Sequence, residues 1–229
     1  MLLREGSDPN ERSEGGMTPL MIAAREGYAE IARILLAVGA DVNATNEVGA
    51  TALRIAVYNG SGELWMRATQ SGAKAIERSA LWADEKMDHE QTARYLIDRG
   101  GRWTEGEEAV LGLIGGEAPA LFLSGQYHRL LAGSHERSGE PAAAGAEYAL
   151  AAELFTNAAR RARGRAHLSI ALGISELVLK TALSALVRQN VGVGRNAGFA
   201  RADFRYTLAH ISGTFADHCR EAAGNVSGE

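Results

Sequence analysis

Cysteine and proline are scarce in this sequence of 229 residues, and aromatic residues make up only 6% of it. The single cysteine, Cys219, excludes an intramolecular disulfide framework and a zinc site built from cysteines, and it fits a reducing compartment. With 4 prolines, alanine-rich stretches and few β-branched runs, the sequence favours helices over sheets. These scarcities predict an all-α, cytoplasmic protein.

Long uncharged apolar runs and a strong charge of one sign are also missing. The most apolar stretch, residues 168–187, contains Glu176 and Lys180, an opposite-charge pair that suits a packed helix better than a membrane span. The first residues become charged at once and show no signal-peptide core. A formal charge of −4 gives no overall attraction to nucleic acid or to an anionic membrane. We therefore expect neither a membrane nor a nucleic acid as the partner.

What the sequence does contain is a repeat of 33 residues. Residues 2–27 align without gaps on residues 35–60, and 12 of the 26 aligned pairs are identical. The identical pairs include Asn10/Asn43, Thr18/Thr51, Leu20/Leu53, Ile22/Ile55 and Gly27/Gly60. Self-similarity at a period of this length is typical of proteins built from stacked structural repeats.

The repeat has the local signals of two short helices. Thr18 is a suitable helix N-cap, and Pro19 follows at the first helical position, where its missing N–H costs nothing. A short apolar helix then ends at Gly27, since glycine readily adopts a left-handed turn. The second helix has apolar residues on one face and ends at a glycine. Those apolar residues are Ile31, Ile34, Leu35 and Leu36, and the glycine is Gly39.

The segments 17–24 (MTPLMIAA) and 39–43 (GADVN) resemble the signatures of the ankyrin repeat family, at the ankyrin period. The resemblance implies a stack of helix pairs joined by hairpins, with partner proteins docking on the hairpin tips and on the exposed face of the inner helices. The tips lie near residues 12–14 and at Thr45, Asn46 and Glu47. The exposed inner-helix positions would be Met21, Arg25, Arg54 and Tyr58.

The second copy of the repeat is interrupted. Its outer helix best matches residues 93–97 with Gly100, at an offset of 61, which is 33 plus an insertion of 28. We therefore predict an ankyrin segment over residues 1–103 with an insert at about residues 61–88. The insert carries Trp65 and Trp82, which either contribute to binding or fix the insert to the core. At the other end, Leu2, Leu3 and Gly6 resemble the tail of an outer helix, so the stack needs further elements to complete its core.

Residues 104–229 lose the repeat but keep helical spacing of apolar residues. Thr104 and Glu107 have capping-box spacing before a short helix that ends at residues 115–116. Four further helices are expected at about 118–137, 141–163, 165–190 and 199–222, with one break at Gly164. We expect this antiparallel array to continue or cap the ankyrin stack. Residues 131–154 faintly resemble a tetratricopeptide helix pair.

No motif for catalysis, a metal or a cofactor emerges. The arginines between residues 160 and 165 suit a solvated helix end better than a phosphate site. The glycine-rich segment 192–198 follows an expected helix rather than the strand that a phosphate-binding loop requires. His128, His135 and His167 could meet in space, but no two histidines have metal-ligand spacing on one helix. No cofactor is expected.

The sequence therefore favours a protein–protein interaction module, a scaffold or adaptor, over an enzyme. The alternative is that the helical half binds a small molecule or catalyses a reaction, with the ankyrin segment as a wall or a dimerisation surface. A pocket near His128 or His135 would favour that alternative, whereas a solid helical core would count against it. The partner protein is not identified by the sequence, and a homo-oligomer stays open.

Overall fold

In the computed structural model, the backbone is described for residues 8–70, 88–103, 117–172 and 201–227. This part of the chain is helical and contains no strand, which confirms the all-α prediction. The helices are α1 (Pro19–Glu26), α2 (Ala29–Ala37), α3 (Ala52–Gln70), α5 (Asp88–Asp98), α7 (Glu117–Arg137), α8 (Pro141–Leu172) and α10 (Arg201–Ser227).

The inner helices of the two repeats begin as the sequence predicts. The Thr18 hydroxyl accepts a hydrogen bond from the backbone N–H of Met21 at 3.3 Å. Its repeat equivalent Thr51 accepts one from the N–H of Arg54, also at 3.3 Å. Each threonine thus satisfies one of the backbone donors left free at a helix start.

The inner helices end differently. Gly27 adopts a φ of 73° and terminates α1. Its equivalent Gly60 lies inside α3, which continues for ten residues to Gln70. The first part of the predicted insert is therefore an extension of the inner helix, since residues 61–70 are mostly good helix formers.

Two asparagines hold successive turns together in the same way. Asn10 donates from Nδ2 to the carbonyl of Gly39 at 3.1 Å and accepts at Oδ1 from the N–H of Asp41 at 2.7 Å. Asn43 donates to the carbonyl of Gly100 at 3.1 Å and accepts from the N–H of Arg102 at 2.8 Å. Gly100 and Arg102 are 61 residues beyond Gly39 and Asp41. The structure therefore places the end of α5 in the repeat position that the sequence alignment assigned to it.

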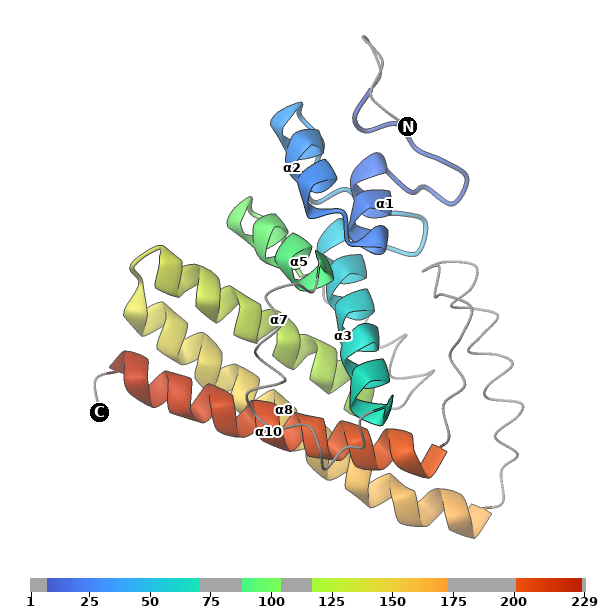
Figure 1. Ribbon diagram of the computed structural model, residues 1–229, viewed down its shortest axis with the longest axis vertical. Helices are drawn as coiled ribbons and strands as arrows, with labels where there is room; N and C mark the ends of the chain where they lie inside the picture. The colour runs from blue at the N-terminus through green and yellow to red at the C-terminus, as the bar shows by residue number, and fades with distance from the viewer. Residues whose placement is uncertain (1–7, 71–87, 104–116, 173–200, 228–229) are drawn as a thin grey trace.

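Helix α7 joins the repeats to the second half of the molecule, and it lies between the repeat helices and the pair α8–α10 (Figure 1). Its Leu123 and Leu130 belong to the same apolar core as the repeat helices. Its Phe122 faces the other core, where the ring lies 5.4 Å from Phe155 and 5.8 Å from Phe215, measured between centroids. The helical array thus covers the end of the repeat stack, as expected from the sequence.

The predicted helices of the second half are confirmed at 118–137 and, with a later end, at 199–222. The predicted break at Gly164 is wrong, because α8 runs without interruption from Pro141 to Leu172. A single helical glycine costs only about 1 kcal/mol, which the flanking arginines and alanines offset. The expected helix at 104–116 and residues 173–190 of the helix expected at 165–190 lie outside the described residues.

Within the described ranges, no helix combines the length and the apolar character needed to cross a membrane.

Candidate interaction surface

The hairpin tips brace one another through the backbone. Nη1 of Arg12 donates to the carbonyl of Thr45 at 2.6 Å, and the N–H of Glu47 donates to the carbonyl of Gly15 at 3.3 Å. The next tip would be distorted by a side chain at Gly16, where a Cβ would lie 3.1 Å from the Glu47 nitrogen. The two tips therefore form one ordered surface, on which the Glu47 side chain is exposed and Thr45 is half-buried.

Asn46 is not available to a partner, which corrects the prediction from the sequence. The residue is buried, and its Oδ1 accepts from the N–H groups of Val48 and Ala50 at 3.1 and 2.8 Å. Its Nδ2 approaches the Met17 sulfur at 3.5 Å. An asparagine that bonds the backbone a few residues ahead shapes a turn, so Asn46 has a structural role here.

Two of the four inner-helix positions expected to be exposed are buried. Met21 is fully buried in the core of the repeats. Arg54 is 9% exposed, and its guanidinium lies over the ring of Trp103, 5.8 Å from the centroid. The sequence prediction assumed an open inner-helix face, but Trp103 occupies the face at Arg54. A cation over an indole ring contributes about 0.5–2 kcal/mol, so Arg54 has a packing role.

Arg25 and Tyr58 remain partly accessible. Burial raises the pKa of the Tyr58 hydroxyl. Arg25 forms an ion pair with Glu26, with 2.7 Å between Nε and Oε1. The carbonyl of Arg25 accepts from Nδ2 of Asn59 at 3.1 Å and lies 2.9 Å from Nε2 of His89. The end of α1 is thus fixed against both helices of the next repeat.

The described tryptophan is the one that sequence reasoning did not single out. Trp103 stacks on Tyr127 of α7, with 5.3 Å between centroids and 20° between the planes. Its position directly after the glycines that end the second repeat was the available signal. Trp82 lies outside the described residues, and the side chain of Trp65 is likewise not described. Their predicted role in binding stays a prediction.

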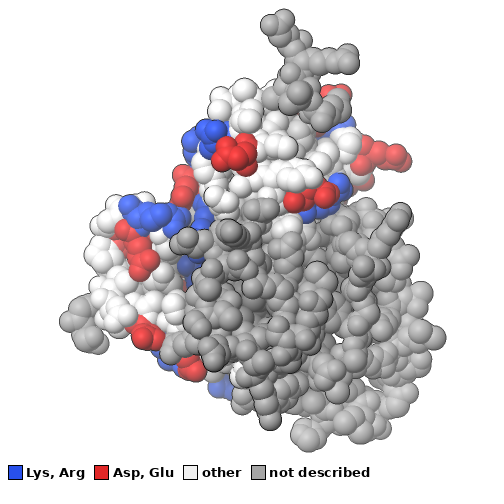
Figure 2. All heavy atoms as spheres, in the orientation of Figure 1, with Lys and Arg blue, Asp and Glu red and all other residues white. Residues whose placement is uncertain are grey.

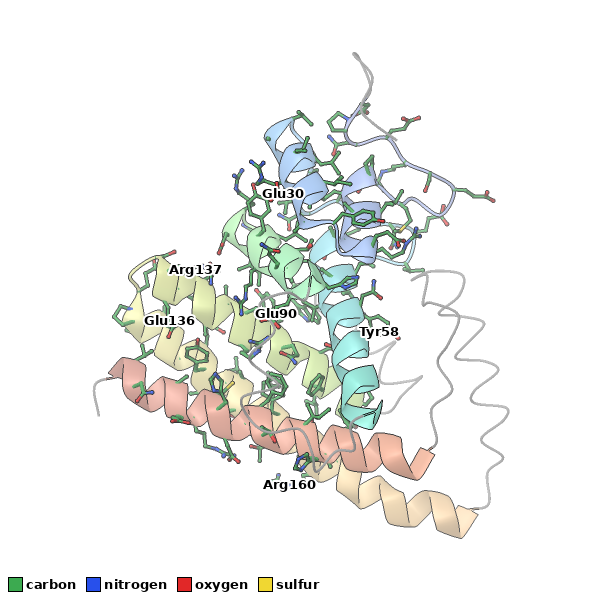
Figure 3. The ribbon with its side chains drawn as sticks, viewed as in Figure 1. Glu30, Tyr58, Glu90, Glu136, Arg137 and Arg160 are labelled. Carbon is green, nitrogen blue, oxygen red and sulfur yellow. The ribbon has the colours of Figure 1, made fainter. Side chains whose placement is uncertain are left out.

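A buried ion-pair network connects the repeats to the helical array, and sequence reasoning missed it. Glu90 of α5 contacts Nη2 of Arg94 at 2.7 Å and Nη2 of Arg129 at 3.0 Å, and Arg129 also donates from Nε to Gln126 at 2.8 Å (Figure 3). Burial tends to raise the pKa of Glu90, but the guanidiniums of Arg129 and Arg94 outweigh it and hold that pKa below its ordinary value. Beside the network is a cavity of about 30 Å³, bordered by Ser61 among others.

The histidines form separate carboxylate pairs. Nδ1 of His128 lies 2.6 Å from Glu147, and Nδ1 of His135 lies 2.6 Å from Glu140. The side chain of His167 is not described. No group of three or more metal-ligating side chains occurs among the described residues.

Of the arginine run, Arg160 donates to Asn157 at 3.2 Å and Arg161 pairs with Glu117, both on exposed surface. The expectation of solvated arginines holds for these two residues. The glycine-rich segment 192–198 lies outside the described residues.

An apolar surface lies on the outer side of α1 and α2, contrary to the expectation that all the apolar residues of the second helix pack together. Leu35 is buried, but Ile31 and Ile34 are about half exposed. We call the exposed set the open repeat face, and it consists of Ile22, Tyr28, Ile31, Ile34 and Val38. Few charged side chains appear around the top of the molecule, where α1 and α2 lie (Figure 2).

Comparison with known families supports the repeat assignment. Residues 1–67 match the family model of ankyrin repeats (3 copies). The N-terminal segment of this chain therefore consists of ankyrin repeats, a class of structure that generally mediates protein–protein interactions. No curated protein matches the chain, and no solved structure does. The helical array after the repeats has no family assignment.

Proposed function

We propose that the chain is a protein-binding module, a scaffold or adaptor, whose partner contacts the hairpin tips of the ankyrin segment. The observation that carries this proposal is the bracing of the two tips described above, from Arg12 to Thr45 and from Glu47 to Gly15. A surface that is ordered before binding loses little conformational entropy when a partner docks.

The side chains on the tips indicate the kind of partner. Glu14 and Glu47 occupy equivalent positions in adjacent hairpins and are both exposed, and Val48 beside them is 51% exposed. Carboxylates around an apolar side chain suit a partner segment with basic residues flanking an apolar one. Arg25 and Tyr58, at the edge of the same segment, would extend the contact.

The described cavity beside Glu90 does not favour the small-molecule alternative. Its volume of about 30 Å³ accommodates one or two water molecules. Ligand sites for drug-sized molecules are about ten times larger. The interaction function is therefore the one that the described geometry supports.

The test is affinity capture from the native host with the full chain, compared with two single charge reversals. Glu47→Lys changes the tip, and Glu153→Lys makes the same charge change on the exposed side of α8. We expect mass spectrometry to identify proteins captured by the wild type and by Glu153→Lys but lost with Glu47→Lys. Equal capture by all three forms would overturn the tips as the binding surface.

A further inference from the structure

We propose that the open repeat face binds a second copy of this chain, so that two repeat stacks meet through α1 and α2 about a two-fold axis. The face contains five exposed apolar side chains on two adjacent helices. Isolated apolar residues are common on protein surfaces, but a contiguous apolar patch marks an interaction site. The proposal concerns a surface other than the hairpin tips and does not depend on the function proposed for them.

The same positions are covered in the next repeat. Ile22 is 38% exposed, whereas its identical equivalent Ile55 is 2% exposed, because α3 packs against α1. In the outer helices, Ile31 is 47% exposed and its equivalent Thr92 is fully buried. The open repeat face is therefore a repeat-stacking surface on which no described part of the chain packs.

The position of His89 shows which way this surface faces. His89 is the equivalent of Tyr28, and its Nε2 lies 2.9 Å from the carbonyl of Arg25 in the preceding repeat. His89 is 9% exposed, whereas Tyr28 is 54% exposed. The open repeat face thus has the geometry of a surface that a helical repeat covers.

Symmetry selects how a second copy can cover it. A head-to-tail arrangement would place the far end of one stack on the open repeat face of the next. That far end is occupied by α7, whose Leu123 and Leu130 are buried in the repeat core. A second copy must therefore present its own open repeat face, which gives an isologous and closed dimer.

The charges around the face permit such pairing. Arg33 pairs with Glu30 at 3.0 Å and Arg25 with Glu26 at 2.7 Å, so the rim has equal numbers of both signs (Figure 3 labels Glu30). A surface that meets its own copy must not repel itself. With α2 antiparallel to its copy near Ile31, Glu30 of one chain approaches Arg33 of the other.

The test is sedimentation equilibrium of the full chain, together with two variants of opposite charge. We expect the wild type to form a dimer, and Ile31→Glu and Ile31→Lys each to weaken it at least about tenfold, because like charges meet across the axis. An equimolar mixture of the two variants should restore the dimer. Leu150→Glu is the matched control, since Leu150 is 40% exposed on α8, away from the face, and should leave the dimer intact.

Circular dichroism and thermal unfolding show whether each variant remains folded. A monomeric wild type over the whole concentration range would overturn the proposal and leave a different protein as the occupant of the face. A dimer that persists in both charged variants, or that the mixture does not restore, would also overturn it. Because capture through the tips is measured separately with Glu47→Lys, failure of one proposal is distinguishable from failure of the other.

Discussion

Glu90 and Arg129 form an ion pair across the junction between the ankyrin repeats and the helical array, with 3.0 Å between Oε2 and Nη2. The two residues are on α5 and α7. The Arg129 guanidinium also lies over the ring of Phe215 in α10, 5.4 Å from its centroid. One buried cation therefore contacts the repeats and a helix of the array at the same time.

Loss of this cation should destabilise the whole protein. We expect Arg129→Met to lower the free energy of unfolding by about 2–4 kcal/mol, because a largely buried Glu90 carboxylate loses its least exposed partner. Arg94→Met removes the other partner, whose side chain is 43% exposed, and should cost less than about 1 kcal/mol. Urea unfolding measures both, and equal losses would contradict the assignment of Arg129 as the central cation.

The same pair predicts a pH dependence. The pKa of Glu90 in the folded protein lies below its ordinary value of 4.5, so the folded state binds fewer protons than the unfolded state. The stabilisation is therefore complete above about pH 4.5 and is lost as the pH falls through the lower, folded pKa. Glu90→Gln should be less stable than the wild type at neutral pH, and the difference should shrink towards pH 3. A difference that stays constant with pH would rule out ionisation of Glu90 as its origin.

The asparagine bonds between successive turns provide a test of the repeat register. Asn43→Ala removes both hydrogen bonds to the segment 100–102, and it should lower the free energy of unfolding by about 1–2 kcal/mol. Asn157→Ala is the control, since the described bond of Asn157 is to Arg160 in its own helix. Thermal unfolding compares the two, and an unchanged midpoint for Asn43→Ala would contradict a structural role for these bonds.

Helices α7 and α8 approach closely at Gly125. A Cβ there would lie 2.8 Å from the ring of the fully buried Phe155. Gly125→Ala should therefore destabilise the protein by about 1–3 kcal/mol, as overpacking does. Gly213→Ala has open space around its added methyl group and should instead raise stability by about 0.5–1 kcal/mol through helix propensity. Denaturant unfolding of both variants checks the sign of each effect.

The fold was predictable where its signals are local. Thr18 and Thr51 cap helices because a cap bond spans three residues, and such spacing is visible in a sequence. The offset of 61 residues was visible for a similar reason, since repeated turns need the same side chains. Gly164 was misjudged because a glycine can end a helix or lie within one, and packing along the whole helix decides between them.

The candidate site was less predictable because exposure depends on distant neighbours. Met21 and Arg54 carried the expected spacing for an open inner-helix face, yet Met21 is part of the repeat core and Trp103 lies over Arg54. The Glu90–Arg129 pair joins residues 39 positions apart on different helices, which no periodicity reveals.

The sequence by itself determined that the protein is helical, that its first part is made of ankyrin repeats and where most helices begin. These properties follow from hydrogen bonds and apolar spacings within a few residues. Only the tertiary structure decided that Ile22 is exposed while Ile55, the same residue in the same repeat position, is buried. The physical reason is that burial depends on whether another helix packs over the residue.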